Sequence, residues 1–185
     1  MDTLTHLSKT ELEAGLEYIR QSPKDDGKVM LIVRRPKVDE REVTGKAELS
    51  LEDGLVGDTW KARGSKATPD GSANIHAQIT IMNSRAVALI AQQEDRWALA
   101  GDQLYVDLNL SDDNLPAGTR LVIGSAILEV SELPHTGCAK FSQRFGVEAH
   151  KFVNSPEGKQ LHLRGINTTV IQAGEIRVGD GVRKS

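Results

Sequence analysis

Cys138, the one cysteine of the chain, is the residue whose type and setting best suit chemistry. It follows a turn that contains Pro134 and Gly137, and a helix is expected to begin directly after it. A cysteine at a helix N-terminus lies at the positive end of the helix dipole, which favours the thiolate, and Lys140 adds to this if it points the same way. A thiolate is a soft metal ligand and a nucleophile toward sulfur donors. The alternative is a buried cysteine that packs as a small apolar residue.

A second candidate is the turn that ends at Asp58. Gly54 and Gly57 lie three residues apart just before it, so the turn is tight and presents a carboxylate or backbone N–H groups to a pocket. The alternative is a plain turn between two strands. The segment is not a dinucleotide-binding fingerprint, because the third glycine and the strand–helix context are missing.

Four arginines form a third candidate group: Arg34, Arg35, Arg41 and Arg164. Guanidinium groups bind phosphate and carboxylate with two parallel hydrogen bonds, so an anion site is expected if these side chains converge. The alternative is charge on the solvated rim of the fold.

Histidines give a weaker signal. The chain has five of them, and none has the spacing of metal ligands with another histidine or with Cys138. His135 lies three residues before Cys138 and could act as its base or hydrogen-bond partner, although a surface loop histidine is the favoured interpretation. Nothing in its surroundings indicates a Cys–His protease.

Short runs of β-branched and apolar residues dominate the chain and predict its strands. They span residues 29–33, 42–51, 78–82, 121–123, 126–130, 168–172 and 175–178. Gly124–Ser125 and Ala173–Gly174 are each expected to form the turn of a β-hairpin. Because the strands do not alternate regularly with helices, a mainly β fold, a closed or nearly closed mixed β-barrel with a few short helices, is favoured over a doubly wound parallel sheet.

Three helical stretches are expected around these strands. Ser8 and Glu11 have the spacing of a capping box, so a helix is predicted to begin there and to end near Pro23. A second helix is expected from residue 83 or 84 to about residue 94. The third lies between residues 138 and 153, with a break at Gly146.

Composition excludes several classes of protein. The 185 residues are 38% hydrophobic and 26% charged, which is typical of a folded domain rather than a disordered chain. The net charge of −3 and the lack of a basic run disfavour nucleic-acid binding. No apolar run approaches the roughly 20 residues that a membrane span needs, and no signal peptide is indicated. With a single cysteine, a reducing cytoplasm is the expected location.

Several short motifs, taken in order, carry a resemblance to a known family. They are G-L-V-G-D at 54–58, Q-I-T-I at 78–81, G-D-Q-L at 101–104, L-V-I-G at 121–124, the cysteine at 138, and R-G-I-N at 164–167. Over residues 43–182 this order resembles the MOSC family, named for the C-terminal domain of molybdenum-cofactor sulfurases. The resemblance implies a β-barrel similar to the small barrel domain of pyruvate kinase at residues 43–185. Residues 1–42 would form a helix and strand extension that packs on it.

The resemblance also implies a role for the cysteine at the mouth of a pocket. In some members this thiolate ligates the molybdenum of a molybdopterin cofactor, and N-hydroxylated compounds are reduced; in others it is proposed to carry a persulfide. Transferred to this chain, Cys138 is the metal ligand and catalytic residue. Arg164, Asp58, Lys140 and Arg34 are the candidate cofactor-binding residues, with Arg164 expected at the pterin phosphate.

Two departures from the family pattern affect the pocket. Trp60 stands where the family often has histidine, and Gln103 where it usually has asparagine. The expected function is therefore either a molybdenum-cofactor reductase or a non-enzymatic sulfur carrier, with a binding module built around a structural cysteine as the plainest alternative. The expected partners are a small-molecule substrate or electron donor, or a cysteine desulfurase, and the chain is expected to be a monomer or a homodimer.

Overall fold

A computed structural model describes residues 4–185 of the chain. Its strands are β1 (Gly27–Arg34), β2 (Glu42–Thr44), β3 (Lys46–Ser50), β4 (Gly54–Leu55), β5 (Ile79–Asn83), β6 (Leu104–Asp107), β7 (Arg120–Ile123), β8 (Ala126–Val130), β9 (Ile166–Gln172), β10 (Gly174–Arg177) and β11 (Gly181–Lys184). Its helices are α1 (Lys9–Ala14), α2 (Leu16–Arg20), α3 (Trp60–Arg63), α4 (Ser84–Ala91), α5 (Ala139–Phe145), α6 (Val147–Asn154) and α7 (Pro156–Gln160), with short 3₁₀ turns η1 (Ile75–Ala77) and η2 (Glu94–Ala100).

Seven strands close into a barrel in the order β11, β7, β8, β9, β5, β6, β1. Pairing of β1 with β11, in which Gly27 lies opposite Val182, completes the ring. All of these neighbours are antiparallel except β5 and β6, which run parallel, so the barrel is mixed as the strand pattern predicted. Closure removes the exposed edges that an open sheet would carry. The short strand β2 pairs with β1 outside the ring.

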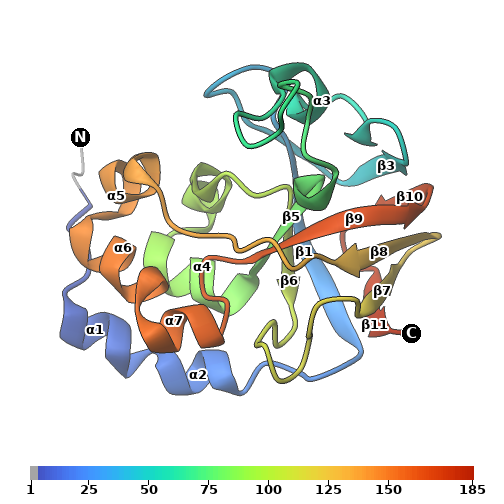
Figure 1. The fold of residues 1–185 in the computed structure, drawn as a ribbon. Helices are drawn as coiled ribbons and strands as arrows, with labels where there is room; N and C mark the ends of the chain where they lie inside the picture. The colour runs from blue at the N-terminus through green and yellow to red at the C-terminus, as the bar shows by residue number, and fades with distance from the viewer. Residues whose placement is uncertain (1–3) are drawn as a thin grey trace.

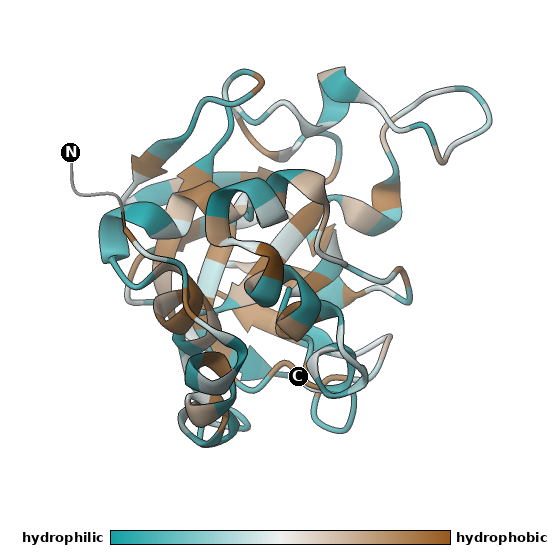
Figure 2. Ribbon diagram, turned by 90° about the vertical axis from the view of Figure 1, so that its left-hand side faces the viewer, coloured by the Kyte–Doolittle hydropathy of each residue, from teal (hydrophilic) through white to brown (hydrophobic). Residues whose placement is uncertain are grey.

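Two hydrophobic clusters fill the molecule. One lies inside the barrel and includes Ile79, Ile81, Leu104 and Leu128. The other lies between the barrel wall and the helices other than α3, which gather on one side of it (Figure 1). Every residue of β5 is buried, because the barrel interior covers one face of the strand and the helices cover the other. Hydrophobic residues accordingly lie on the strands, while the outer turns are hydrophilic (Figure 2).

One of the two predicted hairpins is wrong. The turn at Gly124–Ser125 joins β7 and β8, which pair as expected. The chain at Ala173–Gly174 instead leaves the barrel: β10 pairs with β3, with Ile176 opposite Ala47, and forms a small three-stranded sheet with β4. Gly174 lies so close to Ser125 that an added Cβ would be 2.4 Å from the Ser125 carbonyl carbon, and this contact guides the chain around the end of the β7–β8 hairpin.

The helices agree with the predicted caps but are shorter. Ser8 accepts a hydrogen bond from the Glu11 N–H, and the Glu11 carboxylate accepts from the Ser8 N–H, so the capping box is confirmed. The predicted single helix is divided into α1 and α2 at Gly15. The Asn83 side chain caps α4. Gly146 separates α5 from α6, as predicted, with a φ of 93° that favours glycine.

The domain boundary expected after residue 42 stays a prediction, but one strand assigned to the extension belongs to the barrel. β1 pairs with β6 and β11 and therefore closes the ring, so it does not pack on the outside. Helices α1 and α2 of that segment lie outside the barrel, beside α6 and α7 (Figure 1). Among residues 4–185, no helix is both long enough and apolar enough to cross a membrane.

Candidate functional site

The segment that leads from β8 to Cys138 is held at both ends by side-chain amides. The Asn167 Nδ2 donates to the carbonyls of Leu133 and Pro134, at 3.1 and 3.2 Å. The Gly137 N–H donates to the Asn154 Oδ1 at 2.9 Å, and the Asn154 Nδ2 donates back to the Gly137 carbonyl. A loop fixed in this way can hold a reactive group in one position, which chemistry requires.

Cys138 occupies the N-terminal cap of α5. Its backbone is extended, with φ −109° and ψ 178°, and its carbonyl accepts the Ser142 N–H at 3.1 Å. The side chain is exposed and does not itself cap the helix. The thiol is therefore accessible to a ligand or a partner, which argues against the interpretation of Cys138 as a buried structural residue.

A buried triad lies beneath this segment. The Arg164 Nη1 donates to the Asp102 Oδ2 at 2.5 Å, and the His135 Nε2 lies 2.8 Å from the Asp102 Oδ1. Burial of Asp102 opposes its ionisation, but the charges and hydrogen bonds of Arg164 and His135 outweigh it and lower the pKa of Asp102 to about 2. The pKa of His135 is lowered, first by burial and then by Arg164, so its imidazole is neutral at neutral pH.

The guanidinium of Arg164 therefore binds mainly to groups of the protein itself. Besides the bond to Asp102, its Nη2 donates to the Ala100 carbonyl at 2.8 Å, and its guanidinium carbon lies 5.0 Å from the centre of the Phe141 ring. Its Nε is buried without a partner among the described residues. The expectation that Arg164 contacts an anionic ligand stays a prediction, and Nε is the atom left for it.

Asp58 lies inside a second buried pair. Its carboxylate accepts from the Arg35 Nε and Nη2, at 2.9 and 2.7 Å, and also from the backbone N–H groups of Arg35 and Trp60. Burial raises the pKa of Asp58, but the contacts with Arg35 and Trp60 outweigh it, and the pKa is lowered. The side chain of Asp58 has no exposed surface, so in this structure its carboxylate orients Arg35 and faces no pocket.

Both departures from the family pattern are buried as well. Gln103 accepts from the Thr80 N–H and hydroxyl through its Oε1 and donates to Asp58 through its Nε2. The Trp60 indole donates to the Asn74 carbonyl at 3.2 Å. These two residues therefore tie the Asp58 turn to the barrel.

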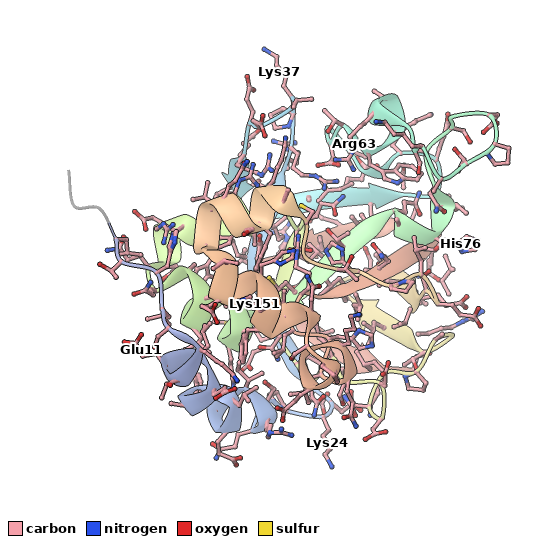
Figure 3. The ribbon with its side chains drawn as sticks, turned by 60° about the vertical axis from the view of Figure 1, so that its left-hand side comes forward. Glu11, Lys24, Lys37, Arg63, His76 and Lys151 are labelled. Carbon is pink, nitrogen blue, oxygen red and sulfur yellow. The ribbon has the colours of Figure 1, made fainter. Side chains whose placement is uncertain are left out.

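A cluster of cations lies along α5, the helix that Cys138 begins. Asp39, at the tip of the β1–β2 connection, accepts from the Lys140 Nζ at 2.8 Å and the Arg144 Nη2 at 3.2 Å. Arg41 donates to the carbonyls of Ala98 and Glu40 and forms no salt bridge with the carboxylates of residues 4–185. We call Arg35, Arg41, Lys140 and Arg144 the basic cluster. Figure 3 shows nitrogen-bearing side chains gathered between α5 and the connection that Lys37 marks.

Like charges face one another in the basic cluster. Burial lowers the pKa of Arg41, and the charges of Arg144 and Arg35 lower it further. Repulsion of this kind is relieved when an anion binds. Arg34, the other arginine predicted for the site, donates to Glu42 through Nη2 at 2.5 Å, while its Nε is buried without a partner among the described residues.

The structure brings some predicted residues together and separates others. Cys138 caps α5, which contains Lys140, and Arg164 lies against Phe141 of the same helix. Asp58 and Arg34 lie at the C-terminal end of β1.

Sequence reasoning did not identify Asp102 or Arg144 as site residues. Asp102 stood only inside the G-D-Q-L motif, and a lone arginine in a helix gives no signal of its own. Within residues 4–185, no three His, Cys, Asp or Glu side chains gather closely enough to hold a metal ion.

Comparisons with known proteins agree with this architecture. The model of the MOSC domain family matches residues 69–183. The YuaD protein from Bacillus subtilis superposes with a TM-score of 0.63 at 16% identity, over 84% of this chain and 93% of that one. YiiM from Escherichia coli superposes with a TM-score of 0.56 at 17% identity, over 85% and 69% of the two chains. YiiM from Geobacillus stearothermophilus gives 0.57 at 16%, over 86% and 75%. At these identities the structures share the fold. No curated protein matches the sequence.

Proposed function

The chain belongs to the MOSC domain family, and from this premise we propose that it binds a molybdenum–pterin cofactor and reduces N-hydroxylated compounds. In this proposal Cys138 is the thiolate ligand of the metal. The observation that carries it is the accessible thiol at the start of α5, beside a basic cluster that lies along the same helix.

The residues present fit such a group in two respects. Cys138 offers one soft sulfur ligand, and a thiolate suits molybdenum better than the hard oxygen of serine or aspartate. The basic cluster supplies charge for the pterin phosphate, because the half-buried guanidinium of Arg41 donates only to backbone carbonyls and forms no salt bridge with a carboxylate of the described residues. Lys140, Arg144 and the unpaired Nε of Arg34 add donors nearby.

The chain would contribute position and charge to the reaction. Bound there, the cofactor supplies the two electrons that convert R–NH–OH and two protons into R–NH2 and water. Asn167 and Asn154 fix the loop that leads to Cys138 by hydrogen bonds, so the sulfur would stay in one position when the substrate enters. Asp58 keeps the Arg35 guanidinium oriented, and Gln103 and Trp60 keep Asp58 in place.

Exposure of Cys138 also supports a second function, sulfur carriage. A desulfurase could reach the thiol and leave one sulfur atom on it as a persulfide. A carrier needs no basic cluster along the helix that Cys138 caps, and this is why the reductase is preferred. Asp58 and Arg164 are fully or largely buried, and contact of either with the cofactor stays a prediction.

Metal content separates the two functions. The wild type and Cys138→Ser, made in a host that assembles the cofactor, are compared for molybdenum per chain by mass spectrometry and for folding by circular dichroism. The reductase predicts molybdenum in the wild type and its loss in a folded Cys138→Ser. A folded wild type without molybdenum that gains the mass of one sulfur atom on Cys138, when mixed with a cysteine desulfurase and cysteine, supports the carrier. Full molybdenum in Cys138→Ser would contradict the ligand assignment.

A further inference from the structure

A cavity of about 580 Å³ opens beside the loop that leads from β8 to Cys138. Its walls come from the loop at residues 130–136, the connection before β7, helix α7 and the start of β9. Leu115, Val130, Val153 and Ile166 make the wall largely apolar, and His135 and Asn167 are polar groups on it. Cys138 does not line it. A cavity of this size with an apolar wall and a few polar groups is the usual form of a small-molecule site.

The buried triad determines which atom of His135 is available to that cavity. With a pKa of about 2, Asp102 is a carboxylate at all moderate pH values, so it can only accept a hydrogen bond. The neutral His135 must therefore carry its proton on Nε2, which lies 2.8 Å from Asp102. Nδ1 is then an unprotonated acceptor, and no described group donates to it.

Packing of the ring supports the same orientation. The Cδ2 edge of His135 lies against Gly165, where an added Cβ would be 3.1 Å away. The opposite edge of the ring carries Nδ1 and faces away from Gly165, so Nδ1 is accessible from the cavity. Asn167 uses its Nδ2 on two loop carbonyls, so its Oδ1 remains as a second acceptor on the same wall.

We propose that this cavity binds a small organic molecule through N–H or O–H donors, and that His135 accepts a hydrogen bond from it at Nδ1. The ligand class is a ring-sized apolar frame with such a donor. Lys159 is offset by Asp112 and Glu132 on the same lining, so a neutral molecule is favoured. The site needs neither the cofactor nor the Cys138 thiol, so it extends beyond the proposed function.

The hydrogen bond leaves the proton on the ligand. Burial and the charge of Arg164 lower the pKa of His135, so the ring stays neutral and Nδ1 acts as an acceptor. Asp102 is a positioning residue, because it keeps the proton of His135 on Nε2. Arg164 binds Asp102 and also lines the cavity.

Histidine-labelled protein tests the tautomer directly by nitrogen NMR. Near neutral pH, His135 is expected to show a protonated Nε2 and a bare Nδ1. A protonated Nδ1 in the wild type would overturn the proposal, and this measurement needs no variant to fold.

Benzimidazole and 1-methylbenzimidazole then form a matched pair of probes, because only the first carries an N–H donor. Benzimidazole is expected to shift the Nδ1 signal of His135 and to bind about tenfold more tightly than the methylated probe, as expected for the loss of one hydrogen bond. His76→Gln, which does not line this cavity, is the control and should bind both probes as the wild type does. Equal binding of the two probes, or no shift at Nδ1, would overturn the proposal. Molybdenum content is measured separately in the wild type and in the control variant, so the result of the probe experiment does not depend on that of the cofactor test.

Discussion

Asp102 and Arg164 form a buried ion pair, 2.5 Å between Oδ2 and Nη1, although 62 residues separate them in the chain. Asp102 lies just before β6 and Arg164 just before β9, on strands that flank β5 on its two sides. The pair joins these two connections beneath the loop that leads to Cys138. His135 completes it from that loop, so one carboxylate fixes three segments of the site.

Asp102→Asn should destabilise the protein strongly. The variant leaves the Arg164 guanidinium buried without its counter-charge, and loss of one partner of a buried ion pair costs roughly 3–5 kcal/mol. Urea unfolding followed by circular dichroism measures the free energy of unfolding. Arg120→Gln, which breaks the exposed pair with Glu129, is the control and should change it by less than about 1 kcal/mol. Equal effects of the two substitutions would mean that the buried pair contributes no more than a surface pair.

Stability should fall as the pH decreases below about 6.5, partly through His135. The pKa of His135 in the folded protein is lower than its ordinary value of 6.5, so the unfolded chain binds more protons between the two values. The contribution is fully present above pH 6.5 and is lost as the pH falls toward the folded pKa. His135→Gln keeps a donor for Asp102 but cannot titrate, so its free energy of unfolding should depend less on pH. Parallel curves for wild type and variant would contradict this origin.

Arg41→Gln should weaken retention of the cofactor while the barrel stays folded. Arg41 is the member of the basic cluster that forms no salt bridge within residues 4–185, so the variant removes a positive charge without breaking an ion pair. Loss of one charge-assisted hydrogen bond predicts affinity lower by about tenfold. Molybdenum per chain after dialysis is the measurement, with Arg120→Gln as the control. Unchanged retention in Arg41→Gln would show that the phosphate lies elsewhere.

Asp39→Asn should have the opposite effect on anions. Asp39 neutralises Lys140 and Arg144, and the pKa of its carboxyl is lowered chiefly by Lys140. Asparagine tolerates the φ of 62° at this position and leaves the two cations without a counter-charge. Binding of inorganic phosphate, measured by calorimetry, should become a few-fold tighter than in the wild type. Weaker binding would indicate that Asp39 organises the cations instead of competing with an anion.

Ser8→Ala should lower the free energy of unfolding by about 1 kcal/mol, the usual cost of losing an N-terminal cap. Both hydrogen bonds of the capping box are present, with the Glu11 N–H 3.3 Å from the Ser8 hydroxyl oxygen. Thr10→Ala on the same helix is the comparison, because it raises helix propensity and touches no cap. If both substitutions shift the urea midpoint in the same direction, the cap has no role of its own.

Local signals in the sequence were enough for much of the fold. The β-branched runs located most of the strands but not β4, β6 or β11, which are at most four residues long. Caps and turns located the helix ends, since these depend on neighbours within a few residues. Ser8, Asn83 and Gly146 were all identified in this way. Ala173–Gly174 looked like the hairpin turn at Gly124–Ser125, because a turn sequence does not specify with which strand the next segment pairs. Only contact with Ser125 and β3 decides that.

The candidate site followed the same division. The sequence alone determined that Cys138 is the sole thiol, that it follows a turn containing proline and glycine, and that the ordered motifs match the MOSC family. The tertiary structure decided what the charges do. Asp58 and Arg164 read as ligand-binding groups, yet each is buried against an opposite charge from a distant segment. Arg41, which carried no distinctive motif, forms no salt bridge within residues 4–185. The local sequence of a charged residue does not show whether the residue is paired, because its partner lies in a distant segment that comes close only when the chain folds.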